Sequence, residues 1–139
     1  MTPKKNVLIL CTGNSCRSQM AEALINARLG DQWQAFSAGT QPAAAVHPKA
    51  RQVLAEIGIQ LRGEPKPAEV FREQAFDLVV TVCDDAAQNC PLWLGQGRRV
   101  HIGFPDPACA SATEQEILAV FRQVRDSIED QVLGFLGGI

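Results

Sequence analysis

The sequence predicts a single α/β domain in which helices cover a parallel sheet. Runs rich in valine, leucine and isoleucine alternate along the chain with helical patterns, and these runs carry no polar face. Strands of this kind are typical of parallel sheets that are buried on both sides. The 139 residues have the length of one domain, which we assign to residues 1–139.

The expected elements follow one another in a regular order. Strands are expected at Lys5–Cys11, Trp33–Ser37, Asp77–Val82 and Val100–Phe104, and helices at Arg17–Leu29, Pro48–Ile57 and from near Thr113 to Val132. In the helices apolar residues recur every three or four positions, which is the spacing of one buried face. Gly30 and Gly58 suit the ends of the first two helices, and Thr113 with Glu116 forms a capping box at the start of the last.

Composition and charge exclude several classes of function. The net charge is −2, whereas a nucleic-acid-binding domain needs a basic face. The longest apolar run near the start, Val7–Leu10, is far too short for a membrane span or a signal peptide. We therefore expect a cytoplasmic protein that binds neither nucleic acid nor membrane, with the monomer as its default state.

The chain contains five cysteines, an odd number that does not suit a disulfide framework in a reducing compartment. No Cys-x-x-Cys pair occurs, so a structural zinc site is not expected. The surroundings of Cys11, Cys83 and Cys90 favour thiol chemistry for these three. Cys16 is expected to pack in the interior and Cys109 to lie at the surface.

The segment Cys11–Ser18 joins the first strand to the first helix and predicts an anion-binding loop. Its small residues let successive backbone N–H groups point inward, and the helix N-terminus adds donors and a positive dipole. Arg17 supplies a planar fork of donors for two oxygens of a tetrahedral oxyanion. The expected oxyanion-binding residues are Thr12, Gly13, Asn14, Ser15, Cys16 and Arg17.

The same features favour the thiolate form of Cys11. A free cysteine is mostly protonated at neutral pH, but helix N-termini and neighbouring cations stabilise the thiolate. Ser18 can donate a hydrogen bond to the sulfur. A thiolate at the bottom of an oxyanion-binding cup suits nucleophilic attack on a phosphate-like centre.

Residues at the carboxyl ends of three predicted strands complete the candidate site. Cys11 closes the first strand, Cys83 follows the third and Asp106 follows the fourth. Ligands of open α/β sheets bind outside the carboxyl ends of the strands. We therefore expect these three residues to meet at one edge of the sheet.

Several motifs together resemble the low-molecular-weight protein tyrosine phosphatase family, and most closely its arsenate reductase branch. They span nearly the whole chain and are Cys11–Glu22, Ser37–Gly39, Asp77–Cys83, Asn89–Pro91, Gly103–Phe104 and Asp106–Pro107. The resemblance implies a three-layer α/β/α fold with a four-stranded parallel sheet. It also implies arsenate as substrate, Cys11 as nucleophile, and Asp106 as the general acid that protonates the leaving oxygen.

Two further thiols separate a reductase from a phosphatase. A phosphatase releases its cysteine adduct with water, whereas a reductase must supply two electrons and needs a thiol that attacks Cys11. We expect Cys11 to attack arsenate, Cys83 to attack Cys11 with release of arsenite, and Cys90 to attack Cys83. The resemblance implies that thioredoxin reduces the final disulfide, and the cysteine pair favours thioredoxin over a glutaredoxin or a low-molecular-weight thiol. No cofactor is expected.

Two other functions stay open from the sequence: hydrolysis of phosphomonoesters through a Cys11 phosphocysteine, and oxyanion binding without catalysis. Neither requires Cys83 and Cys90, so arsenate reduction is preferred. If residues 84–89 are helical in the reduced protein, Cys83 and Cys90 lie about 10 Å apart. A disulfide needs Cα atoms closer than about 7 Å, so oxidation would unwind this segment.

Some reductases of this type bind potassium beside the loop, through residues that match Asn14, Glu22 and Ser37. A further acidic ligand would fall near Lys66, and lysine cannot ligate a cation. We expect the Lys66 ammonium to take that place and pair with Glu22. The sequence therefore predicts no functional potassium site and no other metal.

Overall fold

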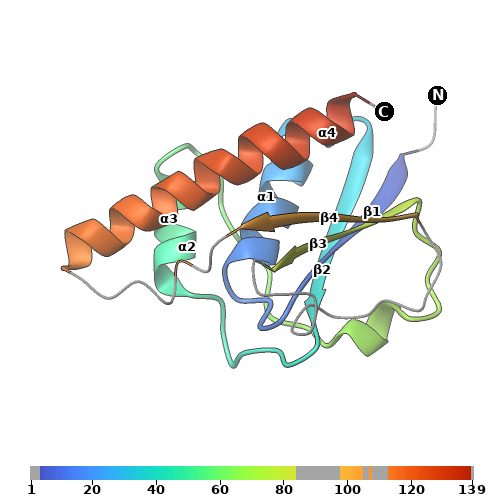
Figure 1. Cartoon of the computed structure of the whole chain (residues 1–139), viewed down its shortest axis with the longest axis horizontal. Helices are drawn as coiled ribbons and strands as arrows, with labels where there is room; N and C mark the ends of the chain where they lie inside the picture. The colour runs from blue at the N-terminus through green and yellow to red at the C-terminus, as the bar shows by residue number, and fades with distance from the viewer. Residues whose placement is uncertain (1–3, 84–97, 105–106, 108–112, 139) are drawn as a thin grey trace.

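The computed structural model describes residues 4–83, 98–104, 107 and 113–138. Four parallel strands form one sheet in the order β2-β1-β3-β4. Their bounds are Lys5–Cys11 for β1, Trp33–Gly39 for β2, Leu78–Cys83 for β3 and Arg98–Phe104 for β4. All neighbouring strands pair in parallel, and their arrows fan out in Figure 1 from β4, which points left, to β2, which points down, so the carboxyl ends of all strands share one edge. The predicted α/β class and four-stranded parallel sheet are confirmed.

Strand pairing lengthens two of the predicted strands. β2 continues to Gly39 because Ala38 and Gly39 pair with the last two residues of β1. β4 begins at Arg98, two residues earlier than expected, because Arg98 pairs with Leu78 of β3. The residues at these ends are polar or small, so the search for apolar runs did not include them in the predicted strands. The longer β2 brings Gly39 level with Cys11.

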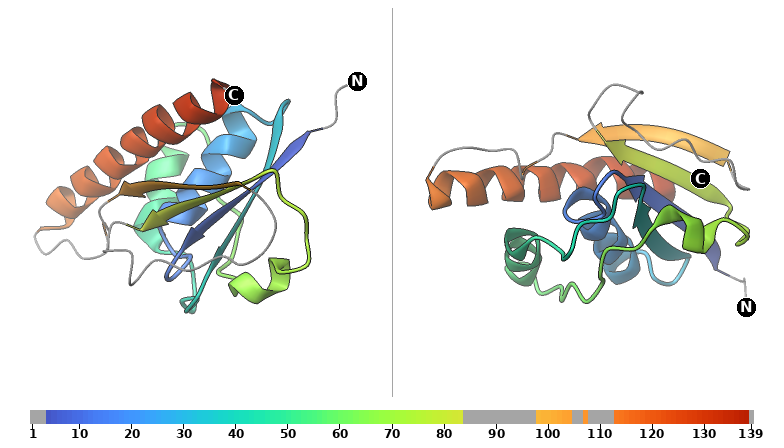
Figure 2. Two further views of the ribbon diagram at one scale, coloured as in Figure 1. Left: turned by 45° about the vertical axis from the view of Figure 1, so that its right-hand side comes forward. Right: turned by 90° about the horizontal axis from the view of Figure 1, so that it is seen from below.

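Three helices, α1 (Arg17–Arg28), α2 (Pro48–Ala55) and α3 (Glu114–Ile128), pack against one face of the sheet. The long α3 runs past α1 and α2 in both Figures 1 and 2. Met20, Ala21, Leu24 and Ile25 on α1 and Phe121, Val124, Ile128 and Val132 at the C-terminal end are buried as expected, whereas Ile117 and Val120, predicted on the same face, are half-buried. These helices enclose the main core with the inward side chains of β1 and β3.

The C-terminal ends of three helices differ from the prediction, the first being that of α1, which stops at Arg28 instead of Leu29. α2 stops at Ala55 instead of Ile57. The N–H groups of Ile57 and Gly58 donate to carbonyls three residues back and not four, and Gly58 has a φ of +79°. At the start of α3 the Thr113 hydroxyl oxygen accepts the Glu116 N–H at 3.2 Å, as expected of a cap. After α3 the helix widens into a π-helical turn, η3 (Glu129–Leu133), before α4 (Gly134–Gly137), and nothing in the sequence pattern announces this turn.

The opposite face of the sheet carries a smaller apolar cluster. Leu8, Leu10, Ala38 and Val79 pack there against aromatic rings that follow the loop at residues 62–67. A short 3-10 helix, η1 (Ala68–Phe71), supplies one of these rings; the sequence had not predicted it. Phe36, Phe71 and Phe76 meet with ring centroids 5.6 to 5.9 Å apart.

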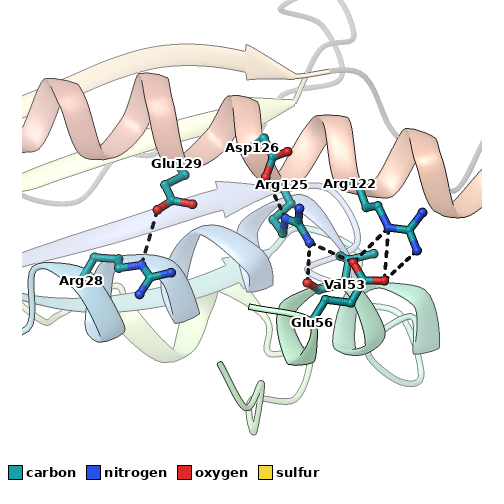
Figure 3. Close-up of polar contacts among 7 residues, drawn as sticks. All are labelled: Arg28, Val53, Glu56, Arg122, Arg125, Asp126 and Glu129. Carbon is teal, nitrogen blue, oxygen red and sulfur yellow. Dashed lines mark hydrogen bonds and ion pairs between the residues drawn. The ribbon is translucent and has the colours of Figure 1, made fainter. Parts of the chain in front are cut away.

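Ion pairs and hydrogen bonds attach the C-terminal helix to the rest of the helical layer (Figure 3). Arg125 is buried and donates to the Val53 carbonyl at 2.7 Å and to Glu56 at 3.1 Å. Arg122 binds the same carboxylate at 2.7 Å, and this hydrogen bond is the main reason that the pKa of Glu56 lies below its ordinary value. In the ranges the structure describes, no helix is long and apolar enough to cross a membrane.

Candidate active site

The predicted anion-binding loop lies at the carboxyl edge of the sheet. β1 ends at Cys11 and α1 begins at Arg17, so five residues make the connection. Cys16 is buried and packs in the main core, as expected. Within the described residues no side chain caps the start of α1. The N–H groups at the start of a helix point toward the loop that precedes it, which suits an anion bound there.

Two groups of the loop contact the Cys11 sulfur, which is buried. The backbone N–H of Asn14 donates to Sγ at 3.2 Å, and the Ser18 hydroxyl lies 3.0 Å from it. The Asn14 side-chain amide also donates to the Ser18 oxygen at 2.7 Å. Because that oxygen accepts from Asn14, its own hydrogen is free to point at the sulfur.

The orientation of the Asn14 side chain follows from its other contacts. Its Oδ1 accepts from the backbone N–H of Lys66 at 2.9 Å and from Gln19 Nε2 at 3.0 Å. A backbone N–H can only donate, so the atom that faces Lys66 must be the oxygen. Nδ2 therefore faces Ser18, and the Ser18 hydroxyl hydrogen is left available to the sulfur. Two hydrogen-bond donors are thus available to this one buried sulfur.

Arg17 joins the loop to the last strand. Its side chain is 5% exposed, and Nη1 donates to the carbonyl of Phe104 at 3.2 Å. Phe104 is the last residue of β4, two positions before Asp106 in the sequence. The guanidinium thus lies where the chain leaves β4, and its remaining donors keep the fork geometry that suits an oxyanion.

Some of the predicted site residues lie at the ends of described strands. Cys83 ends β3, where it pairs with Phe104, and β3 lies beside β1. The backbones of Cys11 and Cys83 therefore end neighbouring strands at one edge, as predicted, and Phe104 ends the next strand beside them. Cys90, Asp106, Cys109 and the expected helix at residues 84–89 lie outside the described residues.

Sequence reasoning missed the residues that hold the loop from outside. Gln19 Nε2 bridges Asn14 to the carbonyl of Glu64. Gly39 lies so close to the loop that a Cβ there would be 2.4 Å from the Thr12 carbonyl oxygen, so only glycine fits. Its N–H donates to the Lys66 carbonyl at 2.8 Å. The hydrogen bond of the Gly39 backbone leaves no signal in a sequence, whereas the need for glycine at this position agrees with the Ser37–Gly39 motif.

Beneath the loop lies a half-buried carboxylate, Glu22. Burial raises the pKa of this carboxyl, and the nearby Lys66 ammonium and the Ser37 hydroxyl and N–H offset part of that rise. The Lys66 ammonium does not form the expected ion pair; it donates to the Glu64 carbonyl at 3.0 Å and attracts Glu22 from there. In the described part of the chain Gln19 Oε1 and Ser37 Oγ are buried without a hydrogen bond of normal geometry.

These surroundings do not fit the potassium site that the resemblance implies. Both acceptor positions of Asn14 Oδ1 are used by N–H donors, so this oxygen is not available to a metal. Lys66 brings a positive charge to the position of the missing acidic ligand. We derive no catalytic step through a metal ion.

Residues 6–139 match the low molecular weight phosphotyrosine protein phosphatase family. An arsenate reductase of Halalkalibacterium halodurans is 47% identical over 134 residues, which cover 95% of each chain. The crystal structure of an arsenate reductase from Archaeoglobus fulgidus superimposes with a TM-score of 0.76 at 33% identity, covering 94% of this chain and 98% of that one.

A thioredoxin-dependent arsenate reductase from Corynebacterium glutamicum superimposes with a TM-score of 0.68 at 27% identity, covering 99% of this chain and 65% of that one. The likeness therefore extends over nearly the whole of this chain in both sequence and fold. With its strand–loop–helix site at the carboxyl edge of a parallel sheet, the chain belongs to the low molecular weight phosphotyrosine protein phosphatase family.

Proposed function

We propose that this protein is an arsenate reductase that passes electrons through Cys11, Cys83 and Cys90 and is regenerated by thioredoxin. The observation that carries the proposal is the convergence of two donors on the buried Cys11 sulfur, with Cys83 ending the adjacent strand. The similarity to arsenate reductases supports the choice of substrate. The similarity to a thioredoxin-dependent enzyme supports the choice of reductant.

In the first step the Cys11 thiolate attacks arsenic and forms a sulfur–arsenic bond. An arsenic–oxygen bond breaks, and Asp106 supplies the proton with which the oxygen leaves as water. Backbone N–H groups of Thr12, Gly13, Ser15 and Cys16 and the fork of Arg17 hold the remaining oxygens, while the Asn14 N–H stays directed at the sulfur. Ser18 keeps the sulfur ionised until it reacts.

In the second step Cys83 attacks the sulfur of Cys11. The sulfur–arsenic bond breaks and its electron pair stays on arsenic, which is reduced from As(V) to As(III) and leaves as arsenite. A Cys11–Cys83 disulfide remains. Cys90 then attacks Cys83, which frees the Cys11 thiolate and leaves a Cys83–Cys90 disulfide. Thioredoxin reduces that disulfide with two electrons, in exchange steps between thiolates and disulfides.

The biological role we propose is arsenic detoxification by a monomer in the cytoplasm. Free thiols and a thioredoxin donor both require a reducing compartment. The second candidate is a phosphomonoester phosphatase, which the family match favours. It would use Cys11, Arg17 and Asp106 in the same roles, and water would replace Cys83 as the attacking group.

Arsenate-dependent oxidation of thioredoxin, measured in wild type and in three variants, tests the proposal. Cys11→Ser is expected to abolish arsenite formation. Cys83→Ser should form the arsenic adduct without releasing arsenite. Cys90→Ser should release about one arsenite per enzyme and then stop, because its disulfide is not passed on. Cys109→Ser, at an expected surface thiol, serves as the matched control.

The same variants separate the alternatives. A phosphatase would hydrolyse p-nitrophenyl phosphate equally well with and without Cys83 and Cys90, and it would form no arsenite. A protein that only binds oxyanions would do neither. Full thioredoxin-coupled turnover by Cys90→Ser would disprove the three-cysteine relay while leaving arsenate reduction itself in place.

A further inference from the structure

Residues 41–47, which we call the strap, lie against the outer side of the anion-binding loop. The strap donates three backbone hydrogen bonds to loop carbonyls: Gln41 to Thr12 at 3.0 Å, Ala43 to Gly13 at 2.8 Å and His47 to Ser15 at 3.1 Å. The Ser15 hydroxyl returns one bond to the Ala45 carbonyl at 3.1 Å. Four hydrogen bonds thus join the strap to the loop, although the two segments do not pair as strands.

The bond from Ala43 acts on the peptide group between Gly13 and Asn14. The C=O and N–H of a planar trans peptide point in opposite directions. Holding the Gly13 carbonyl on the outer side therefore turns the Asn14 N–H toward the inner side, where it donates to Cys11 Sγ at 3.2 Å. One outer contact thus determines the direction of one inner donor.

The loop sequence alone does not fix this peptide. Gly13 has no Cβ and accepts a wide range of ψ, and Asn14 tolerates the left-handed region, where its φ is +51°. Rotation of the peptide between two such permissive residues has little steric cost. The opposite orientation would turn the Gly13 carbonyl dipole toward the thiolate and remove the N–H donor from it.

We propose that Ala43 is a positioning residue, whose backbone N–H holds the Gly13–Asn14 peptide in the orientation that stabilises the Cys11 thiolate. The inference rests on the proposed function in taking Cys11 as the nucleophile. Ala43 makes no hydrogen bond to the sulfur among the described residues, and it acts through the Gly13 carbonyl. Its side chain is exposed, so its identity is not required by packing.

Ala43→Pro tests the proposal because proline has no N–H. Ala44→Pro is the matched control: Ala44 is also exposed, and its N–H makes no hydrogen bond to the loop among the described residues. A second variant replaces Ala43 by lactic acid, which exchanges the N–H for an ester oxygen without adding a ring. The readout is the pH dependence of iodoacetamide alkylation at Cys11, located by mass spectrometry.

We expect Ala43→Pro and the ester to move the alkylation midpoint up by about one pH unit, which is about a tenfold loss of thiolate below the midpoint. Ala44→Pro should titrate like wild type. The proposal is overturned if the ester variant stays within about 0.2 unit of wild type, or if Ala44→Pro shifts as far as Ala43→Pro. If Ala43→Pro does not fold, the ester decides. A wild-type midpoint like that of free cysteine would instead contradict the proposed nucleophile.

Discussion

The sulfur of Cys11 and the hydroxyl oxygen of Ser18 lie 3.0 Å apart, and a third residue, Asn14, contacts both of them. Asn14 donates its side-chain N–H to the Ser18 oxygen and its backbone N–H to the Cys11 sulfur. Asn14 is itself held by donors from Gln19 and from the backbone of Lys66. The hydrogen bonds at the nucleophile therefore depend on a segment about fifty residues further along the chain.

Ser18→Ala removes one of the two donors and is expected to weaken the thiolate. A hydrogen bond to a charged group contributes about 1.5–3 kcal/mol, so arsenate reduction should fall about 10- to 100-fold. The midpoint of Cys11 alkylation should rise by about one to two pH units. The control is Ser127→Ala on α3. Unchanged alkylation in Ser18→Ala would contradict the assigned direction of the bond.

Arg125→Met is expected to destabilise the fold much more than Arg122→Met. Both arginines bind Glu56, but only Arg125 is buried and also pairs with the Val53 carbonyl (Figure 3). An unpaired buried carbonyl costs about 1–3 kcal/mol, which corresponds to a fall in Tm of about 4–10 °C for a domain of this size. The exposed Arg122 pair should change Tm by less than about 3 °C. Thermal unfolding followed by circular dichroism distinguishes the two, and equal losses would contradict this division.

Glu22→Gln is expected to stabilise the protein at neutral pH. Burial raises the pKa of the Glu22 carboxyl above its ordinary 4.5, with Lys66 and Ser37 offsetting part of the rise. The folded state therefore binds this proton more tightly, and stability falls as pH rises through the interval from the ordinary to the raised value. We expect Tm of the variant to exceed that of wild type by about 2–4 °C at pH 7. The difference should close below pH 4.5, where the carboxyl is protonated in both states.

The matched control for Glu22→Gln is Glu69→Gln, which removes an exposed carboxylate on η1. Its Tm should follow wild type across the same pH range. A Glu22→Gln variant less stable than wild type at pH 7 would mean that attraction to Lys66 outweighs burial.

Much of the fold was predictable because its signals are local. The apolar runs of β1 and β3 need no partner to be recognised, and the α1 face follows from helical spacing. The loop from Cys11 to Ser18 was predictable because its residue types are those that bind oxyanions. Its place at the carboxyl edge, beside the ends of β3 and β4, followed from the rule for parallel sheets.

The contacts that orient the loop were not predictable. The strap acts through backbone N–H groups, which every residue but proline carries, so Ala43 has no distinguishing side chain. In the sequence Gln19 is simply a polar residue near the start of a helix. Its contacts with Asn14 and with the Glu64 carbonyl become visible only in the structure, where residues 64–66 lie beside it. The expected Lys66–Glu22 pair had the right partners, but the flexible lysine reaches the Glu64 carbonyl instead.

Lys66→Asp is expected to create a dependence on potassium that wild type lacks. In wild type the Lys66 ammonium supplies positive charge near Glu22, and a bound cation would be repelled. Aspartate would place a second carboxylate beside Glu22 and the buried oxygens of Gln19 and Ser37, while the backbone N–H at position 66 keeps its bond to Asn14.

Wild type should show the same Tm and activity in potassium and sodium chloride of equal ionic strength. In the variant potassium should raise Tm by about 3 °C or more over sodium. Lys49→Asp, which removes a lysine paired with Glu114 instead, should respond to neither salt specifically. A potassium-specific rise in wild type would show that Lys66 does not keep the cation out.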